Sequence, residues 1–406
     1  MPIELTARTP AGATLLALAD RLAADLATRA PAHDRDGSYP FQSIDALREA
    51  GYLAAPVPAE LGGLGVESVH DLVVASARLA RGDASVAIGV NMHLHVAFGI
   101  ARRRRMAAAS GDSRRTAAFD ASLADIARGE TVIATAVSEP GQDLTRPSTR
   151  ATPTAAGWRI DGRKVFCTMS PAATLLLAAV TYRHDDGGER YGYAQVPADT
   201  PGVVVHGDWD ALGMRASGSH SVTFDGVEVP RAALRGGFAT GDPVPYIERS
   251  LGAGLFHASA SLGIAEAASV GVTRALAARG GSNDARTRML AAESAMDLAA
   301  CRAVLARAAT LLDEHYEAHP QSSGSEAAIV DLFSEEQAAK TLVNEGAARI
   351  VDRALALSGG AGYANSHPLS RAYRDVRAGA FMHPLGANRA YEFIGRRSLG
   401  EAPALH

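Results

Sequence analysis

Hydrophobic residues recur every three or four positions through the first part of the chain, a spacing typical of amphipathic helices. Between Leu15 and Leu26 the leucines lie on one face of such a helix. Residues 31–39 interrupt the pattern with Pro, Asp and Gly, and we expect a loop there. The pattern therefore predicts a helical N-terminal domain over residues 1–130.

The periodicity changes at residue 131, where short runs rich in β-branched and aromatic residues begin. Several runs alternate apolar and polar positions, and Gly, Pro and Asp separate them, as in antiparallel sandwiches and barrels. Longer helical periods follow and predict helices over roughly 250–279, 286–318 and 325–357. The expected fold class is α+β, with a central antiparallel β domain (131–235) and a C-terminal four-helix bundle (246–406).

Composition narrows the function classes. The chain has 406 residues with 40 Lys+Arg against 44 Asp+Glu, and this near-neutral balance argues against a nucleic-acid or membrane-surface partner. The longest apolar stretch, near Leu175–Val180, is too short to span a bilayer, and the first residues do not resemble a signal peptide. Cys167 and Cys301 are too few for a disulfide framework. We therefore expect a cytoplasmic protein.

Common catalytic motifs are absent from the sequence: there is no Walker loop, GxSxG elbow, HExxH or GxGxxG. His315 and His319 lie one helical turn apart but no third ligand is indicated, so we expect a solvated helix end and no metal site. Three stretches of the β domain offer polar groups beside strands, which suits a planar polar ligand. These are residues 136–149, 160–168 and 208–220, and each by itself is weak evidence.

The order and spacing of these segments, within the α–β–α layout, resemble the acyl-CoA dehydrogenase superfamily of flavoproteins over nearly the whole chain. PVPAELGGLG (56–65) resembles the family's Pro-Glu-x-x-Gly-Gly-x-Gly segment. AVSEPG (136–141) resembles its Thr-Glu-Pro flavin segment, and GRKVFCT (162–168) its Lys-x-Trp-Ile-Thr strand. Residues 212–230 resemble the end of its β domain, and residues 358–377 resemble its Gly-Gly-x-Gly-Tyr and Tyr-Arg-Asp segments.

The resemblance implies a flavin, FAD, held by the β domain. Apolar and aromatic side chains would pack the isoalloxazine ring, while hydroxyl and N–H groups bind its polar edge. The residues that match these positions are Val137, Ser138, Phe166, Cys167 and Thr168.

The resemblance also implies a homotetramer, or at least a dimer, in which one subunit contacts the FAD of its neighbour. The matching residues are Arg279 and the loop glycines Gly359, Gly360 and Gly362, whose small size lets phosphates approach. This chain departs from the family near the adenine end. It lacks the Phe-Gly that follows the arginine, and Ala356 stands where Gln is usual.

Acyl-CoA dehydrogenation needs a carboxylate base, and its expected place is unusual here. The commonest family position reads Ala380-Phe381-Met382-His383-Pro384, without a carboxylate. Glu248 resembles a second family position, but its spacing to Gly263 is longer than usual by more than a helical turn. Glu248 is therefore either the base or a solvated residue near a helix N-terminus. The expected substrate contacts are Gln142 and Arg249.

The C-terminal part resembles a second type of C-terminal domain in this superfamily, found in dehydrogenases and in flavin-dependent monooxygenases. In the monooxygenases a histidine near this point assists the oxygen chemistry of the flavin, and His383 lies near that position. A neutral imidazole suits this role because it can donate a hydrogen bond to oxygen. The alternative is a histidine before Pro384 that caps a helix.

The first functional expectation is FAD-dependent α,β-dehydrogenation of an acyl thioester, on coenzyme A or an acyl-carrier protein, with electrons passed to an electron-transfer flavoprotein. The alternative is a monooxygenase that uses reduced flavin, FAD or FMN, from a flavin reductase and acts on another small molecule. A third reading, a scaffold without flavin, conflicts with the intact segments 138–140 and 166–168. Thr168 favours the first reading, whereas the missing carboxylate and His383 favour the second.

Overall fold

The computed structural model describes residues 4–141, 143–280 and 284–405. The N-terminal region is helical, and α1 begins where the Thr9 side chain accepts a hydrogen bond from the Gly12 N–H and Pro10 takes the first helical position. α1 continues through Pro31 and ends at Gly37, which has a left-handed φ of 64°. The loop expected over 31–39 is therefore wrong for 31–36. The helices are α1 (Pro10–Asp36), α2 (Phe41–Glu49), α3 (Val69–Ala80), α4 (Ala84–Ala109) and α5 (Ser113–Ala127).

Eight strands form one sheet in the centre of the chain, with the order β6-β7-β3-β2-β4-β5-β8 and β1 beside β4. Most neighbours are antiparallel, but β1 and β2 each pair with β4 in parallel, so the sheet is mixed. The strands are β1 (Ile133–Ala136), β2 (Arg150–Pro153), β3 (Gly157–Cys167), β4 (Leu175–Arg183), β5 (Glu189–Pro197), β6 (Val203–Val205), β7 (His220–Pro230) and β8 (Leu234–Ala239).

The C-terminal region is helical again, and its three long helices lie where the periodicity predicts them. Asp284 and Ser325 cap the second and third of these with side-chain oxygens. The helices are α6 (Val244–Ser250), α7 (Ala253–Ala278), α8 (Ala285–Ala318), α9 (Glu326–Ser358), α10 (Pro368–Asp375) and α11 (Ala387–Ser398). The α+β fold class, with helical, β and helical regions in this order, is confirmed.

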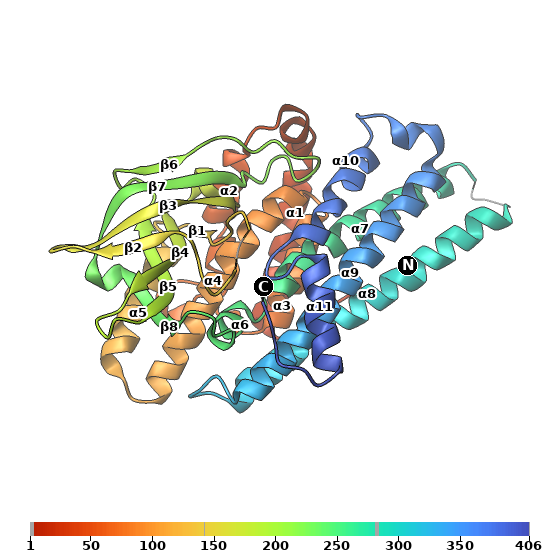
Figure 1. Ribbon diagram of the computed structural model, residues 1–406. Helices are drawn as coiled ribbons and strands as arrows, with labels where there is room; N and C mark the ends of the chain where they lie inside the picture. Colours follow the sequence, from red (N-terminus) through yellow and green to blue (C-terminus); the bar gives the residue numbers. More distant parts are fainter. Residues whose placement is uncertain (1–3, 142, 281–283, 406) are drawn as a thin grey trace.

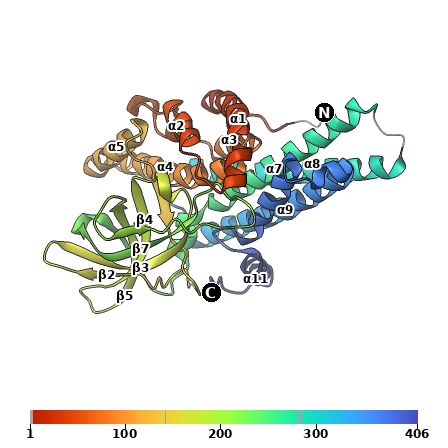
Figure 2. The ribbon, with the colours of Figure 1, turned by 90° about the horizontal axis from the view of Figure 1, so that it is seen from above.

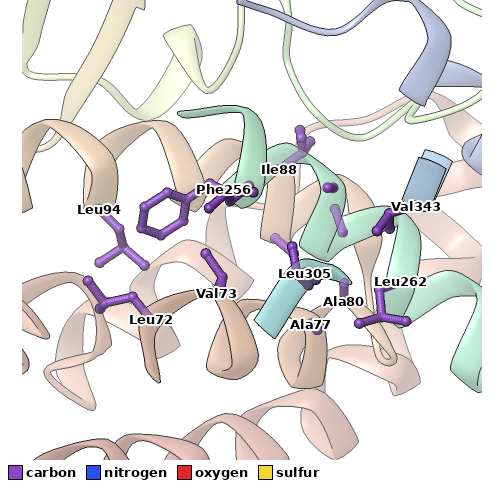
Figure 3. Packing of buried hydrophobic residues seen from close by; sticks show 14 of the residues in the cluster. Leu72, Val73, Ala77, Ala80, Ile88, Leu94, Phe256, Leu262, Leu305 and Val343 are labelled. Carbon is purple, nitrogen blue, oxygen red and sulfur yellow. The ribbon is translucent and has the colours of Figure 1, made fainter. Parts of the chain in front are cut away.

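The sheet and the long helices α7–α9 occupy opposite ends of the molecule, and α6 and α11 lie near their junction (Figure 1). Seen from above, α1–α5 cover one side of both parts (Figure 2). Figure 3 shows the core between α3, α4 and α7, where Leu72, Leu94 and Phe256 pack together.

The helices α4 and α7 are long and apolar enough to cross a membrane by length and composition, but 78% of each apolar window is buried inside the fold. Buried core helices often have the same length and apolar composition, so α4 and α7 are weak evidence for a membrane span.

Candidate active site

A cavity of about 650 Å³ lies between the sheet and the C-terminal region. Its β-domain wall includes Ser138 after β1, Phe166 near the end of β3, and Trp209 before β7. The opposite wall includes His383 and Arg389. The fold thus brings together three residues that the sequence predicts for the site, namely Ser138, Phe166 and His383.

Phe166 has an unusual backbone and an exposed ring. The β3–β7 register shifts between Lys164 and Cys167, and Phe166 adopts a positive φ of 56°. Positive φ costs a bulky residue about 1–3 kcal/mol. The ring is nonetheless 60% exposed at the cavity. Its centre lies 5.8 Å from the centre of the Trp209 ring, and the two rings meet edge to face. A strained, exposed aromatic beside a second aromatic fits a flat ring system such as isoalloxazine.

The neighbours of Phe166 take different positions. Cys167 points into the sheet core and is fully buried, which raises the pKa of its thiol to about 12. Its side chain therefore lies away from the cavity. The Thr168 hydroxyl lies 3.0 Å from the Ser219 hydroxyl, and Ser219 lines the cavity. Val137 is partly buried beside them, and its carbonyl accepts a hydrogen bond from Lys164.

A buried ion pair fixes the turn that carries Ser138. The Lys164 ammonium lies 2.6 Å from Glu139, and the same carboxylate accepts hydrogen bonds from the Ser148 and Thr149 backbones. Burial by itself would raise the pKa of Glu139, but the Lys164 charge and these donors lower it to about 2. The sequence analysis missed this pair. The available signal was that Lys164 and Lys340 are the only lysines in an arginine-rich chain.

His383 is neutral at the inner wall of the cavity. Burial lowers its pKa to about 3, and the charges of Lys340 and His95 act in the same direction. The Tyr246 hydroxyl lies 3.0 Å from Nε2 of the His383 ring. An uncharged imidazole that is also oriented by a phenol can donate or accept one hydrogen bond at the cavity.

Lys340 holds the segment around His383. Its ammonium is buried and donates to the carbonyl oxygens of Met382 and, at 2.5 Å, Leu385. Burial lowers the pKa of Lys340 to about 7, partly opposed by the charge of Glu336. Glu336 in turn accepts hydrogen bonds from the N–H groups of Gly252 and Gly254, each at 2.7 Å.

Unpaired polar atoms surround the first turn of α7, close to His383. Both ring nitrogens of His257, both amide atoms of Gln337 and Nδ1 of His95 are buried without a hydrogen-bond partner among the described residues. Leaving such an atom unpaired costs about 1–3 kcal/mol. Five of them are too many for a fold with about 5–15 kcal/mol of net stability unless polar groups of a ligand or water satisfy them.

Glu248 and Arg249 do not reach the cavity. Glu248 is exposed on α6, where the Ser323 hydroxyl donates to its carboxylate. The Arg249 guanidinium stacks 4.0 Å above the Tyr193 ring. Neither residue lines the cavity among the described residues, and Gln142 lies outside the described residues. The cavity carboxylates come from the β domain, whereas His383 and Arg389 supply the charged or titratable groups of the opposite wall.

Arg279 lines a second cavity of about 300 Å³, between α7 and α10. Ser358 and Ala361 line it as well, so the fold brings Arg279 beside the glycine segment. Gly359 and Gly360 are exposed there and Gly362 is buried. Within the described part of the chain, the two cavities share no lining residue.

Comparison with known proteins places these observations in a family. Residues 13–103, 134–227 and 255–384 match the N-terminal, middle and C-terminal domains of acyl-CoA dehydrogenases. The chain is 35% identical to the amino sugar nitrososynthase DnmZ of Streptomyces peucetius, over 97% of this chain and 95% of that protein. It is 36% identical to the amino sugar nitrososynthase RubN8 of Streptomyces rubradiris, over 97% and 92%.

A solved structure is similar throughout. KijD3 in complex with FMN and dTDP-3-amino-2,3,6-trideoxy-4-keto-3-methyl-D-glucose superposes with a TM-score of 0.89 at 32% identity, covering 99% of this chain and 97% of KijD3. The expected resemblance is thus confirmed, and a flavin is the cofactor class that it supports. The chain belongs to the acyl-CoA dehydrogenase family and is a flavin-dependent oxidoreductase.

Proposed function

We propose that this protein is a monooxygenase that uses reduced flavin to oxidise the amine nitrogen of an amino sugar linked to a nucleoside diphosphate. The proposal adopts the alternative reading of the sequence in place of acyl thioester dehydrogenation. Its support comes from the inner wall of the cavity and from the similarity over the whole chain to amino sugar nitrososynthases.

The observation that carries the proposal is the neutral His383 at the place where a dehydrogenase needs a carboxylate. Proton abstraction next to a thioester carbonyl requires a base whose pKa suits the working pH. An imidazole with a pKa of about 3 is a poor base at neutral pH. It is a suitable hydrogen-bond donor to oxygen, and the Tyr246 hydroxyl fixes its orientation. Glu248, the alternative base, is exposed on α6.

The flavin supplies two electrons and activates dioxygen when it is bound. In the first round, amine, dioxygen and reduced flavin give hydroxylamine, oxidised flavin and one water. In a second round, hydroxylamine, dioxygen and reduced flavin give the nitroso compound, oxidised flavin and two waters. The chain contributes the cavity wall: Phe166 and Trp209 would pack against the flavin ring, and His383 would offer a hydrogen bond beside it.

FMN is the proposed flavin, and a separate reductase supplies it in reduced form. The similar KijD3 structure contains FMN. In addition, the sequence departs from the family at Ala356, beside the loop that the resemblance assigns to the adenine end of FAD.

The test supplies FMN, a flavin reductase and isotopically labelled dioxygen to the purified chain, with a dTDP-linked amino sugar as substrate. We expect labelled oxygen on the sugar nitrogen, detected by mass spectrometry. The matched control is the corresponding sugar with a hydroxyl group in place of the amine, which should give only hydrogen peroxide. Anaerobic bleaching of the flavin by an acyl-CoA, without label incorporation into the amino sugar, would overturn the proposal in favour of dehydrogenation.

A further inference from the structure

The first turn of α7 is the meeting point of polar side chains from three helices. His257 lies on α7 itself, Gln337 comes from α9 and His95 from α4. A Cβ atom placed on Gly254 would lie 3.3 Å from the Gln337 amide nitrogen, and one on Gly252 would lie 3.8 Å from Nδ1 of His95. Gly254 and His257 are three residues apart and share a helix face. The three side chains therefore converge on one small region.

Two of these side chains are buried without partners, and the partly buried His95 has one unpaired ring nitrogen. His257 is 5% exposed and Gln337 is fully buried, and neither makes a side-chain hydrogen bond among the described residues. His95 donates through Nε2 to the Arg249 carbonyl at 3.2 Å, which leaves Nδ1 as an unpaired acceptor. The region thus offers acceptors and donors together, from two imidazoles and an amide. Groups that carry both functions, such as hydroxyls and amines, match this set.

The region lies next to the segment around His383, which lines the main cavity, and its three side chains stand behind the residues that form the cavity wall. Lys340 donates to the carbonyls on both sides of His383. It follows Gln337 by three residues on α9, so the two side chains lie on the same face of that helix. The charges of Lys340, His383 and His95 also act on His257, whose pKa burial already lowers far below its usual value. These couplings place His257 within electrostatic reach of the cavity wall.

We propose that His95, His257 and Gln337 form an inner subsite that binds the amine and hydroxyl groups of the sugar ring, with His257 and Gln337 determining specificity for the amino sugar. The inference rests on the proposed function and assigns the polar ring of the substrate to this end of the cavity. An acyl chain, by contrast, would leave the unpaired polar atoms of these side chains without a partner.

The surrounding charges favour the uncharged amine. The charged and titratable groups around the subsite are His95, Lys340 and His383, which act on His257, and Arg103 and Arg249, which act on His95. Glu336 lies beside Gln337 on α9. Burial lowers the pKa of His95 to about 4, so this imidazole is neutral. Glu336 is occupied by two backbone N–H groups, and burial raises its pKa to about 7. A cationic amine therefore meets Lys340 without a free carboxylate, whereas a neutral amine keeps the lone pair that oxidation requires.

The experiment replaces the two specificity residues with apolar residues of similar size, His257→Leu and Gln337→Met. Binding to the FMN-saturated full chain is measured by calorimetry with two probes, dTDP alone and dTDP-3-amino-2,3,6-trideoxy-4-keto-3-methyl-D-glucose. We expect roughly 10- to 100-fold weaker binding of the amino sugar nucleotide to each variant, from loss of one or two hydrogen bonds, and unchanged binding of dTDP.

Thermal unfolding without ligand gives an independent readout. Because the replaced atoms are unpaired, both variants should melt at the wild-type temperature or above it. The matched control is Asn344→Leu on the same helix, whose buried amide is paired with Ser261 and the Gly379 carbonyl. This control should melt at a lower temperature and keep its preference for the amino sugar nucleotide.

Two outcomes overturn the inference separately from the proposed function. Variants that bind the amino sugar nucleotide as the wild type does would show that water alone satisfies these atoms. Variants that melt well below the wild type would show that the side chains have structural partners. A wild-type chain that binds both probes equally would overturn the subsite and the proposed substrate together.

Discussion

Replacing Lys340 with Met tests whether this buried cation holds the segment that carries His383. Met keeps the length of the side chain but removes every donor. The carbonyl oxygens of Met382 and Leu385 then lose their partner, and Glu336 loses the nearby positive charge. We expect a less stable protein in which His383 is no longer held in one position.

The size of the effect follows from the two hydrogen bonds. A bond from a charged donor contributes about 1.5–3 kcal/mol, and removing one member of a buried charge pair costs about 3–5 kcal/mol. Burial lowers the pKa of Lys340 to about 7, so the amine is only partly charged at neutral pH. At neutral pH, Lys340→Met should reduce the free energy of unfolding by about 3 kcal/mol.

The pH dependence has a definite sign. The pKa of Lys340 is about 7 in the folded state and near 10.5 in the unfolded chain. Between these values the unfolded chain binds more protons, so stability rises with pH, by up to about 1.4 kcal/mol per unit. This contribution is fully present above pH 10.5 and is lost as the pH falls through about 7. The stability difference between wild type and Lys340→Met should therefore widen between pH 7 and 9.

Urea unfolding at several pH values measures the stability, and hydrogen peroxide released per reduced flavin measures the coupling of oxygen to substrate. We expect more peroxide from Lys340→Met, and partial rescue in Lys340→Arg. The control is Arg302→Met, which removes another buried cation of the bundle, paired with Glu266 at 2.7 Å. It should lose comparable stability and release no additional peroxide. A Lys340→Met variant that loses less than about 1 kcal/mol and couples like the wild type would refute the reasoning.

Three further predictions concern single residues. His383→Gln should lower amine oxidation by roughly 10²–10⁴-fold and raise peroxide release, because the oriented imidazole is lost; equal oxidation by wild type and variant would exclude the role. Glu248→Gln should leave turnover within about twofold, since its carboxylate is exposed and bonded to Ser323; a loss of a hundredfold would reinstate it as the base. Phe166→Gly relieves the positive φ but removes the packing ring, so unfolding should require more urea without flavin while FMN binds roughly tenfold more weakly; fluorescence titration with FMN checks both the direction and the size.

The periodicity of the sequence predicts the architecture well because short-range geometry controls it. Helical spacing alone locates α7, α8 and α9 to within a few residues. The family motifs place Ser138 and Phe166 in one site, because motif residues are tied to local turns and strand ends. The extension of α1 through Pro31 was not predicted. The helix continues there because its buried apolar face runs to Ala30, and this packing outweighs the one hydrogen bond that proline removes.

The tertiary structure decides which candidates share a cavity and in which protonation state. The sequence leaves both Glu248 and His383 as candidates. In the fold, α6 directs the carboxylate to solvent, while Lys340, 43 positions before His383, holds the imidazole at the cavity. The same holds for His95, His257 and Gln337, which have no common motif. Their pKa values and unmet hydrogen bonds arise from burial against helices far apart in the chain, and burial is a property of the packed fold rather than of any local segment.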